Sequence, residues 1–244
     1  MEYSILFIGA FIAEIMGTIS GFGSSSIFLP IAHQIFQYET ALILVAIYHI
    51  FGNTSRFSLF WKHWDKKIFF LFGIPSIFAT VLGVQLVGII SSDILKMILG
   101  IILIIFALYS FLKPRFKIQA NMYTGIIGGA SSGFTAGLIG TGGVLRGAFI
   151  TAFGLKKEAY IATIASIALL VDFTRIPIYF HKGFLPEEFF LYVIILFFIA
   201  FAGSYIGKKI IKHIDSNILR KIILIMIMIM SSILIMQGYS NYFL

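Results

Sequence analysis

Two glycine-rich strings, GFGSSSIFLP at residues 21–30 and GTGGVLR at residues 140–146, interrupt the two longest apolar stretches of the chain. These stretches cover about residues 3–37 and 121–155, too long for one crossing, since a spanning helix needs about 20 apolar residues. Glycine permits the backbone conformations that break a helix. We therefore predict that each stretch is a helical hairpin that turns at its glycines within the membrane.

The composition is that of a membrane protein. The chain has 244 residues, of which 59% are hydrophobic and 11% are charged, and its mean hydropathy is +1.02. A soluble domain is about half apolar and a quarter charged. Six further apolar stretches each fit one crossing, so we predict a polytopic all-α membrane protein. These stretches are about residues 40–60, 67–90, 94–112, 158–180, 187–207 and 217–237.

The charged residues and the absence of cysteine exclude several classes of function. Lysines and arginines number 18 against 10 acidic residues, and they cluster between apolar stretches. That pattern is typical of membrane orientation rather than of nucleic-acid binding. The chain has no cysteine, so disulfides and thiolate chemistry are excluded.

The two glycine strings mark an internal repeat with an offset of 119 residues, at which Gly21 matches Gly140. At the same offset Glu39, Asn53 and Arg56 match Glu158, Asp172 and Arg175. We predict a first repeat over residues 1–112, a basic linker over 113–120 and a second repeat over 121–244. Before each break runs a ridge of small residues at every fourth position, which lets helices approach closely in lipid. The ridges are Gly9, Ala13, Gly17, Gly21 and Gly128, Ser132, Ala136, Gly140.

The basic residues indicate how the repeats are oriented. If every stretch crossed the membrane, the loop lysines and arginines would be divided almost evenly between the two faces, against the positive-inside rule. If the two broken stretches turn back, all of them except Lys96 and Lys182 fall on one face. We therefore predict inverted repeats, each a hairpin plus three transmembrane helices, in a bacterial cytoplasmic membrane with both termini outside. Such transporters bind substrate near the midplane, where the repeats meet.

The paired glycine strings, the repeat length and the four-segment pattern resemble the sulfite exporter TauE/SafE family of membrane transporters, over nearly the whole chain. Its members carry two copies of a G-x-G-G-G-like motif followed by apolar residues and proline. The resemblance implies transport of sulfite, sulfonates or related small sulfur-containing anions. The chain departs from the motif in two places. Serines replace two glycines of the first copy, and Arg146 and Phe149 replace an aliphatic residue and a proline in the second.

The predicted binding site is formed by the two breaks. The helix that begins after each break points free N–H groups and a partial positive charge at it, which suits an anion. Serine hydroxyls add donors, and the planar arginine fork matches sulfonate-like oxygens. The predicted substrate-binding residues are Gly21, Gly23, Ser24, Ser25, Ser26, Gly140, Gly142, Gly143 and Arg146.

Alternatives stay open for several buried polar residues. Arg146 could instead pair with Glu14 or reach the lipid surface, and Glu14 could relay a proton. The pairs Asn53/Arg56 and Asp172/Arg175 have i, i+3 spacing and share a helical face, as a brace, a gate or part of the substrate path. The predicted gating or coupling residues are thus Glu14, Asn53, Arg56, Asp172 and Arg175. His33 and His49 are interpreted as buried hydrogen-bonding residues, because their spacing matches no metal motif.

The function predicted from the sequence is transport of a small anion by a secondary carrier or exporter, with a channel-like pore as the alternative. The predicted partners are a small anionic substrate and the lipid bilayer. Paired catalytic carboxylates, nucleophile–base spacing and ATPase motifs are absent from the sequence, so we predict neither an enzyme nor a cofactor or metal. The small-residue ridges could pack the two halves together or bind a second subunit, which leaves a homodimer open.

Overall fold

The computed structural model describes residues 2–21, 23–89, 92–113 and 119–243, and this part of the chain folds into helices without a strand. Most of the predicted linker 113–120, and Phe22 in the first glycine string, lie outside the described residues. The helices of the first half are α1 (Glu2–Ser20), α2 (Ser25–Ala32), α3 (Tyr38–Phe60), α4 (Lys66–Gln85) and α5 (Ser92–Leu112). Those of the second are α6 (Met122–Ile139), α7 (Gly143–Ala152), α8 (Lys157–His181), α9 (Phe190–Ile211) and α10 (Ser216–Phe243).

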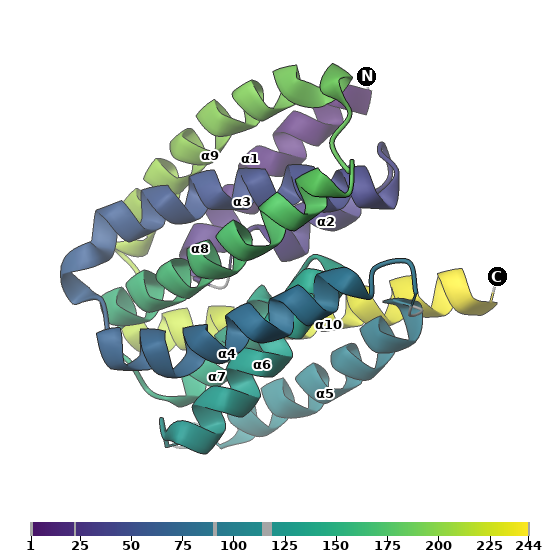
Figure 1. The fold of residues 1–244 in the computed structure, drawn as a ribbon. Helices are drawn as coiled ribbons and strands as arrows, with labels where there is room; N and C mark the ends of the chain where they lie inside the picture. The colour runs from purple at the N-terminus through teal and green to yellow at the C-terminus, as the bar shows by residue number, and fades with distance from the viewer. Residues whose placement is uncertain (1, 22, 90–91, 114–118, 244) are drawn as a thin grey trace.

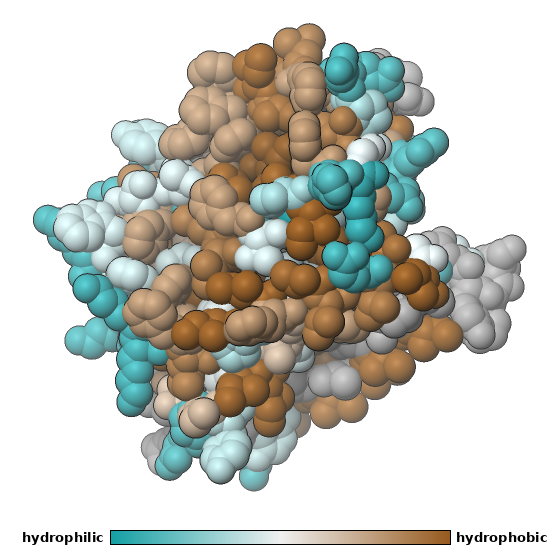
Figure 2. All heavy atoms as spheres, in the orientation of Figure 1, coloured by the Kyte–Doolittle hydropathy of each residue, from teal (hydrophilic) through white to brown (hydrophobic). Residues whose placement is uncertain are grey.

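The helices have the length and the surface of membrane-spanning elements. Four spans among the described residues are long and apolar enough to cross a bilayer: Lys66–Gln85, Lys157–His181, Glu187–Ile211 and Asn217–Ser240. Large hydrophobic side chains are exposed on the outside, among them Phe78 and Phe198. Figure 2 shows hydrophobic residues over the middle of the visible face and hydrophilic ones gathered toward its ends. The chain is therefore an all-α, multi-pass membrane protein.

Each of the two longest apolar stretches is a pair of antiparallel helices. Gly9 of α1 packs against Ile31 of α2, and Gly17 against Ser24, so α2 returns along the helix it follows. In the second half, Gly128 packs in the same way against Phe149. The breaks thus lie at the predicted glycines, and α2 and α7 begin at Ser25 and Gly143, inside the predicted half-helix starts.

The remaining helices pair across the two halves of the chain (Figure 1). Helix α1 packs on α9 while α6 packs on α4, and α3 packs on α9 while α8 packs on α4. Helices α3 and α8 contact each other, and so do α5 and α10. If the halves are aligned element by element, every one of these contacts has a counterpart in which the halves are exchanged.

Apart from the two glycine breaks, the described connections between helices lie at two opposite ends of the bundle. At one end Lys157 Nζ donates to Ile214 O at 3.1 Å, and Lys208 Nζ lies 5.8 Å from the Phe60 ring. This basic end, at the left of Figure 1, therefore holds the α3–α4, α7–α8 and α9–α10 connections. At the other end Lys182 Nζ donates to Val84 O at 3.1 Å. The two chain termini lie toward that second end (Figure 1).

The predicted small-residue ridges are used for packing inside the chain. The C-terminal parts of both ridges face the second helix of their own hairpin: Gly17 lies on Ser24, and Ser132 Oγ donates to Gly142 O at 3.1 Å. Another row of small residues on α6 lies against α4, where Ser76 Oγ donates to Gly129 O at 2.9 Å. These contacts use the ridges within one subunit and give no support to a homodimer.

Candidate functional site

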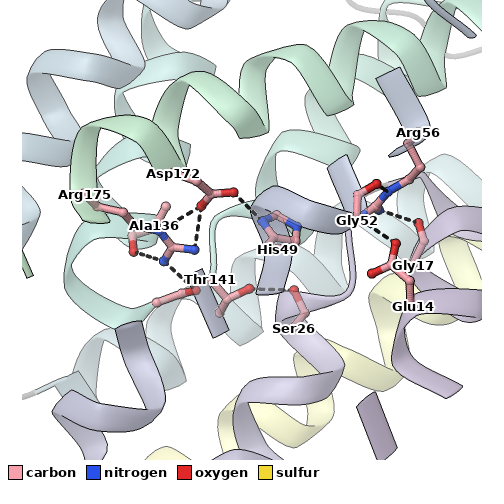
Figure 3. A network of polar contacts seen from close by, with 11 residues as sticks. Glu14, Gly17, Ser26, His49, Gly52, Arg56, Ala136, Thr141, Asp172 and Arg175 are labelled. Atoms are coloured by element: carbon pink, nitrogen blue, oxygen red, sulfur yellow. Dashed lines mark hydrogen bonds and ion pairs between the residues drawn. The ribbon is translucent and has the colours of Figure 1, made fainter. Parts of the chain in front are cut away.

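The two glycine breaks, which we call the first elbow (Gly21, Gly23 and Ser24) and the second elbow (residues 140–142), face each other inside the bundle. Gly21, Gly23 and Gly140 have φ angles of 82°, 98° and 81°, which residues with a side chain rarely adopt, so glycine is what allows the turns. Just past the first elbow, Ser26 Oγ lies 2.6 Å from Thr141 Oγ1, and both side chains are buried (Figure 3). The predicted meeting of the two breaks is therefore present in the structure.

Both helices that leave the elbows begin without a side-chain cap. Ser24 precedes α2 and Gly142 precedes α7, and neither residue provides a capping hydrogen bond. The first N–H groups of a helix have no partner within the helix, and they carry its partial positive charge. Two such helix starts therefore point this charge toward the elbow contact, an arrangement that suits a negatively charged group.

An ion pair in the first half fixes the first elbow. Arg56 Nη2 lies 3.2 Å from Glu14 Oε1, and Arg56 Nη1 donates to Gly17 O at 3.2 Å. Glu14 also accepts from Ser204 Oγ at 2.8 Å. Because both partners are fully buried and Glu14 is bound to Arg56, the suggested pairing of Glu14 with Arg146 is wrong. The Asn53/Arg56 spacing does not form a pair either.

A second ion pair fixes the second elbow. Arg175 Nη2 lies 2.7 Å from Asp172 Oδ1, one turn earlier on the same face of α8. Its Nη1 donates to Ala136 O and Gly140 O, both at 2.9 Å. Ala136 lies in the last turn of α6, and Gly140 is the residue directly after its end. Carbonyls at the end of a helix lack helical partners and attract a cation. Each arginine thus ties the third helix of its half to the helix that enters the elbow.

His49 connects the two ion-pair systems and is the residue whose role the sequence did not reveal. Its Nδ1 lies 2.8 Å from Asp172 Oδ2, a contact between α3 and α8. In Figure 3 it stands between Asp172 and the Arg56–Glu14 pair. A signal was present, because His49, Asn53 and Arg56 are spaced i, i+4 and i+7 and therefore share one face of α3.

Arg146 is the buried cation that these pairs leave without an anion. Its side chain is 2% exposed on the first turn of α7, and among the described residues Nε and Nη1 have no hydrogen-bond partner. The charges that act on it are Asp172, Arg175 and Arg56, and the first two are already paired with each other. Three buried arginines therefore stand against two buried carboxylates. Arg146 does not reach lipid, so the snorkelling alternative is also wrong.

Further polar atoms near the first elbow have no hydrogen-bond partner within the described parts of the chain. They are Ser24 Oγ, His49 Nε2, Glu14 Oε2, Arg56 Nη2 and both polar atoms of the Asn53 side chain. Buried polar groups are normally hydrogen-bonded, and exceptions call for an explanation such as a ligand. The hydroxyl, the amide N–H and the free guanidinium N–H groups are donors, which is the set that an oxyanion requires.

A cavity of about 130 Å³ leads from the elbow contact toward the end of the bundle that lies opposite the basic end. Ser26 and Thr141 line its inner part, and α10 forms one wall through residues such as Met230 and Leu234. The exposed side chains His33 and Gln34 line it as well, with Tyr38 and Gln237. The sequence did not predict this contribution of α10, because an apolar helix carries no signal for which of its faces borders a cavity.

The family follows from comparison of the whole chain with known families. A family model described as Sulfite exporter TauE/SafE matches residues 6–234. The chain belongs to this family. TauE/SafE membership makes it a membrane transport protein, and the match includes both elbows, both ion pairs and Arg146. Neither the curated proteins nor the solved structures gave a match.

The structure places all of the predicted binding residues in one buried region. Both elbows and the starts of α2 and α7 are buried, and Arg146 lies on the first turn after the second elbow. The predicted gating residues lie beside them as two ion pairs, with Asn53 free. Within this TauE/SafE chain, the elbows therefore form the candidate site, and the ion pairs form its support.

Proposed function

We propose that this TauE/SafE protein is a secondary carrier for a small sulfur-containing oxyanion or organosulfonate, such as sulfite. The observation that carries the proposal is Arg146, a buried guanidinium without a carboxylate of its own. It lies on the first turn of α7, directly after one of the two uncapped helix starts, and the charges that act on it are Asp172, Arg175 and Arg56. A guanidinium in a membrane interior is costly unless a negative group or a polar cavity compensates it. A bound oxyanion supplies that compensation through charge-assisted hydrogen bonds.

In this proposal the substrate lies between the elbows. The N–H groups at the starts of α2 and α7 and the Ser24, Ser25 and Ser26 hydroxyls bind one part of the anion, and Arg146 binds another. The glycines at 21, 23, 140, 142 and 143 allow the backbone to approach it closely. Glu14, Arg56, Asp172 and Arg175 hold the elbows in place, while the Asn53 amide, on the same face of α3 as Arg56, adds a donor.

The proposed architecture is a pair of inverted repeats, residues 1–112 and 121–244, joined by the linker 113–120. Support comes from the helix contacts, which keep their pattern when the halves are exchanged: α1 on α9 corresponds to α6 on α4. It also comes from the two arginines, because Arg56 binds Gly17 O and Arg175 binds Ala136 O, and both pairs of positions are 119 residues apart. Transporters with this symmetry bind substrate where the repeats meet.

We place the basic end on the cytoplasmic side of a bacterial inner membrane, with both termini outside. The supporting observation is that the loops bearing Lys157 and Lys208 lie together at one end. Cytoplasmic loops are the ones that carry an excess of lysine and arginine. In this orientation the cavity beside Ser26 and Thr141 opens toward the outside.

A carrier fits the site better than a continuous pore. The cavity reaches the elbow contact, but Arg146 is not among the residues that line it. Ser26 and Thr141 touch at the inner end of the cavity. An anion that enters from outside would therefore need a movement of the elbows to reach Arg146, which is how alternating access operates.

Exchange in proteoliposomes tests this function. Purified protein is reconstituted, loaded with unlabelled sulfite, thiosulfate or sulfoacetate, and supplied outside with the radiolabelled form of the same anion. A carrier should give saturable uptake that is faster when the inside is loaded, whereas a pore should give conductance without saturation. Liposomes without protein provide the background. The absence of flux for all three anions, with protein that is folded by its thermal transition, would contradict the proposal.

A further inference from the structure

His49 contacts Asp172 through one ring nitrogen (Figure 3), and its other nitrogen lies against Gly23 of the first elbow. Nδ1 lies 2.8 Å from Asp172 Oδ2, and the side chain is 3% exposed. Nε2 has no hydrogen-bond partner within the described residues. It points at the first elbow, because a Cβ added to Gly23 would collide with it. The second nitrogen is thus a buried polar atom directed at the elbow.

Asp172 determines which of the two nitrogens carries hydrogen. The carboxylate is held by Arg175 at 2.7 Å, and an ionised carboxylate can only accept hydrogen bonds. Nδ1 must therefore be the donor, and the neutral ring then presents a lone pair at Nε2. A lone pair on Nε2 and an anion without a proton repel each other, because both are electron-rich. An anion can bind favourably at this nitrogen only if a proton lies between the two.

We propose, building on the anion transport proposed above, that the site binds one proton together with each anion, and that this proton is held at His49 Nε2. It can come from hydronium or a buffer acid in the solution, which gives up the proton and converts the ring to the imidazolium. It can also arrive on a hydrogen-oxyanion, whose O–H then donates to Nε2. Both routes give the same complex of protein, anion and one proton, and no other bond changes. A site loaded in this way carries the proton in the same direction as the anion.

The charges around His49 link the two binding events. With His49 neutral, the three buried arginines exceed the two carboxylates by one charge, and a proton on the ring makes the excess two. A bound anion offsets this excess, so anion and proton favour each other's binding, and such linkage is reciprocal. The buried titratable groups on the surrounding helices are Glu14 on α1, Tyr48 and Arg56 on α3, Arg146 on α7, and Tyr160, Asp172, Arg175 and Tyr179 on α8. Helix α2 has none, and the lysines of α9 lie in its last turn.

Titration calorimetry on the full chain in detergent measures the proton directly. The probe is thiosulfate or methanesulfonate, whichever exchanges faster in proteoliposomes, because neither anion changes its own charge between about pH 5 and pH 8. Titrations at pH 7 in two buffers of different ionisation enthalpy give the number of protons taken up. We expect about one proton per anion, and an affinity that falls by up to about tenfold per pH unit as the pH rises.

Two variants assign the proton to His49. His49→Asn can still donate to Asp172 but cannot titrate, so it should bind the anion more weakly and without proton uptake. Asp172→Asn frees the tautomer, so a neutral ring can present N–H at Nε2, and binding should again take up no proton. The matched control is His63→Asn in the exposed 3-10 helix at the basic end, which should retain the uptake of wild type.

Each outcome decides the proposal, and the wild-type titration decides it even if a variant fails to fold. Anion binding by wild type without proton uptake would overturn the proposal and leave anion transport intact. Uptake that persists in His49→Asn would also overturn it, because another group such as Glu14 would then carry the proton. If neither probe exchanges or binds, this proposal falls, and the exchange of sulfite and sulfoacetate decides whether anion transport by this site falls with it.

Discussion

The two elbows have the same backbone turn but different side chains. In the first half the elbow is followed by three serines, and Arg56 is neutralised by Glu14 from α1. In the second half Gly143, Val144 and Leu145 stand at the positions of the three serines, and Arg175 is neutralised by Asp172 from its own helix. At an offset of 119 residues Ile27 aligns with Arg146. The second half thus brings the free charge, and the first half brings neutral donors.

This difference shows which features the fold requires and which the substrate requires. Both halves keep an arginine that binds carbonyls of the helix entering the elbow, Gly17 O in one and Ala136 O in the other. That contact is structural, since it occurs in both halves. Arg146 and His49 occur in one half each, at places where the other half has Ile27 and Ala168. A charged or titratable side chain that occurs in only one of two repeats indicates function more strongly than a contact that occurs in both.

The largest expected effect on anion exchange comes from replacing Arg146 by an apolar residue, as the first half has at Ile27. Arg146→Met keeps an unbranched apolar side chain and removes the charge, so anion exchange should fall at least about 100-fold, a loss of about 3 kcal/mol in anion stabilisation. The melting temperature should stay the same or rise, because an apolar side chain replaces a buried, unpaired cation. Exchange in proteoliposomes and thermal unfolding in detergent measure the two effects.

The control for this substitution is Ile150→Met, a buried position further along α7 that is outside the proposed site. It should keep wild-type exchange with a small loss of stability. Undiminished exchange by Arg146→Met would remove this arginine from the site, and the contrast between the elbows would lose its functional meaning.

Breaking an ion pair should show its structural role. Glu14→Gln leaves Arg56 fully buried without a negative partner, and removing one member of a buried pair typically costs about 3–5 kcal/mol. We expect a clearly lower melting temperature in detergent. Glu158→Gln is the control: it lies 3.8 Å from Lys157 near the basic end, and its side chain is 38% exposed. Such a pair contributes about 1 kcal/mol or less. Equal stability of the two variants would argue against Glu14 as a brace.

The sequence predicted the frame of this site well and its contacts less well. Helix breaks at Gly21 and Gly140 could be predicted because glycine in an overlong apolar stretch has a direct conformational meaning. The Asp172–Arg175 pair could be predicted because its partners are one helical turn apart. The partner of Glu14 could not, because contacts between α1 and α3 depend on how helices pack and not on sequence spacing.

His49 shows a second kind of limit. Its contact with Asp172 joins residues 123 positions apart, on helices from different halves. A lone histidine in an apolar helix fits many surroundings, so the interpretation as a buried hydrogen-bonding residue was correct but incomplete. The direction of Nε2 toward Gly23 depends on the left-handed turn of the elbow, which the sequence suggests without giving its geometry.

A glycine comparison separates backbone strain from the close approach of the elbow. Gly23 and Gly88 have φ angles of 98° and 83°, so alanine is strained at both. At Gly88 no atom lies within 4 Å of the added methyl group, whereas at Gly23 it would collide with the His49 ring. We expect Gly88→Ala to cost about 1 kcal/mol and Gly23→Ala about twice that or more, with loss of anion exchange in Gly23→Ala alone.

Similar losses of stability in both glycine variants would mean that the ring can move aside without cost. Exchange decides the functional part, because a displaced His49 can no longer direct Nε2 at the elbow. Normal exchange in Gly23→Ala would therefore show that transport does not need the close approach of His49 to the first elbow.

The smallest expected effect concerns the contact that joins the elbows. Ser26→Ala, Thr141→Val and the double variant form a cycle around the 2.6 Å hydroxyl contact. We expect a coupling of about 1 kcal/mol in unfolding experiments, the usual size for a neutral hydrogen bond. If this contact closes the inner end of the cavity, Thr141→Val should also exchange anion faster than wild type, because the closed arrangement is weakened. Ser26→Ala also loses a proposed donor to the anion, so it should gain less or exchange more slowly. A coupling without any change in exchange would make the contact a brace between the elbows and place the moving barrier elsewhere.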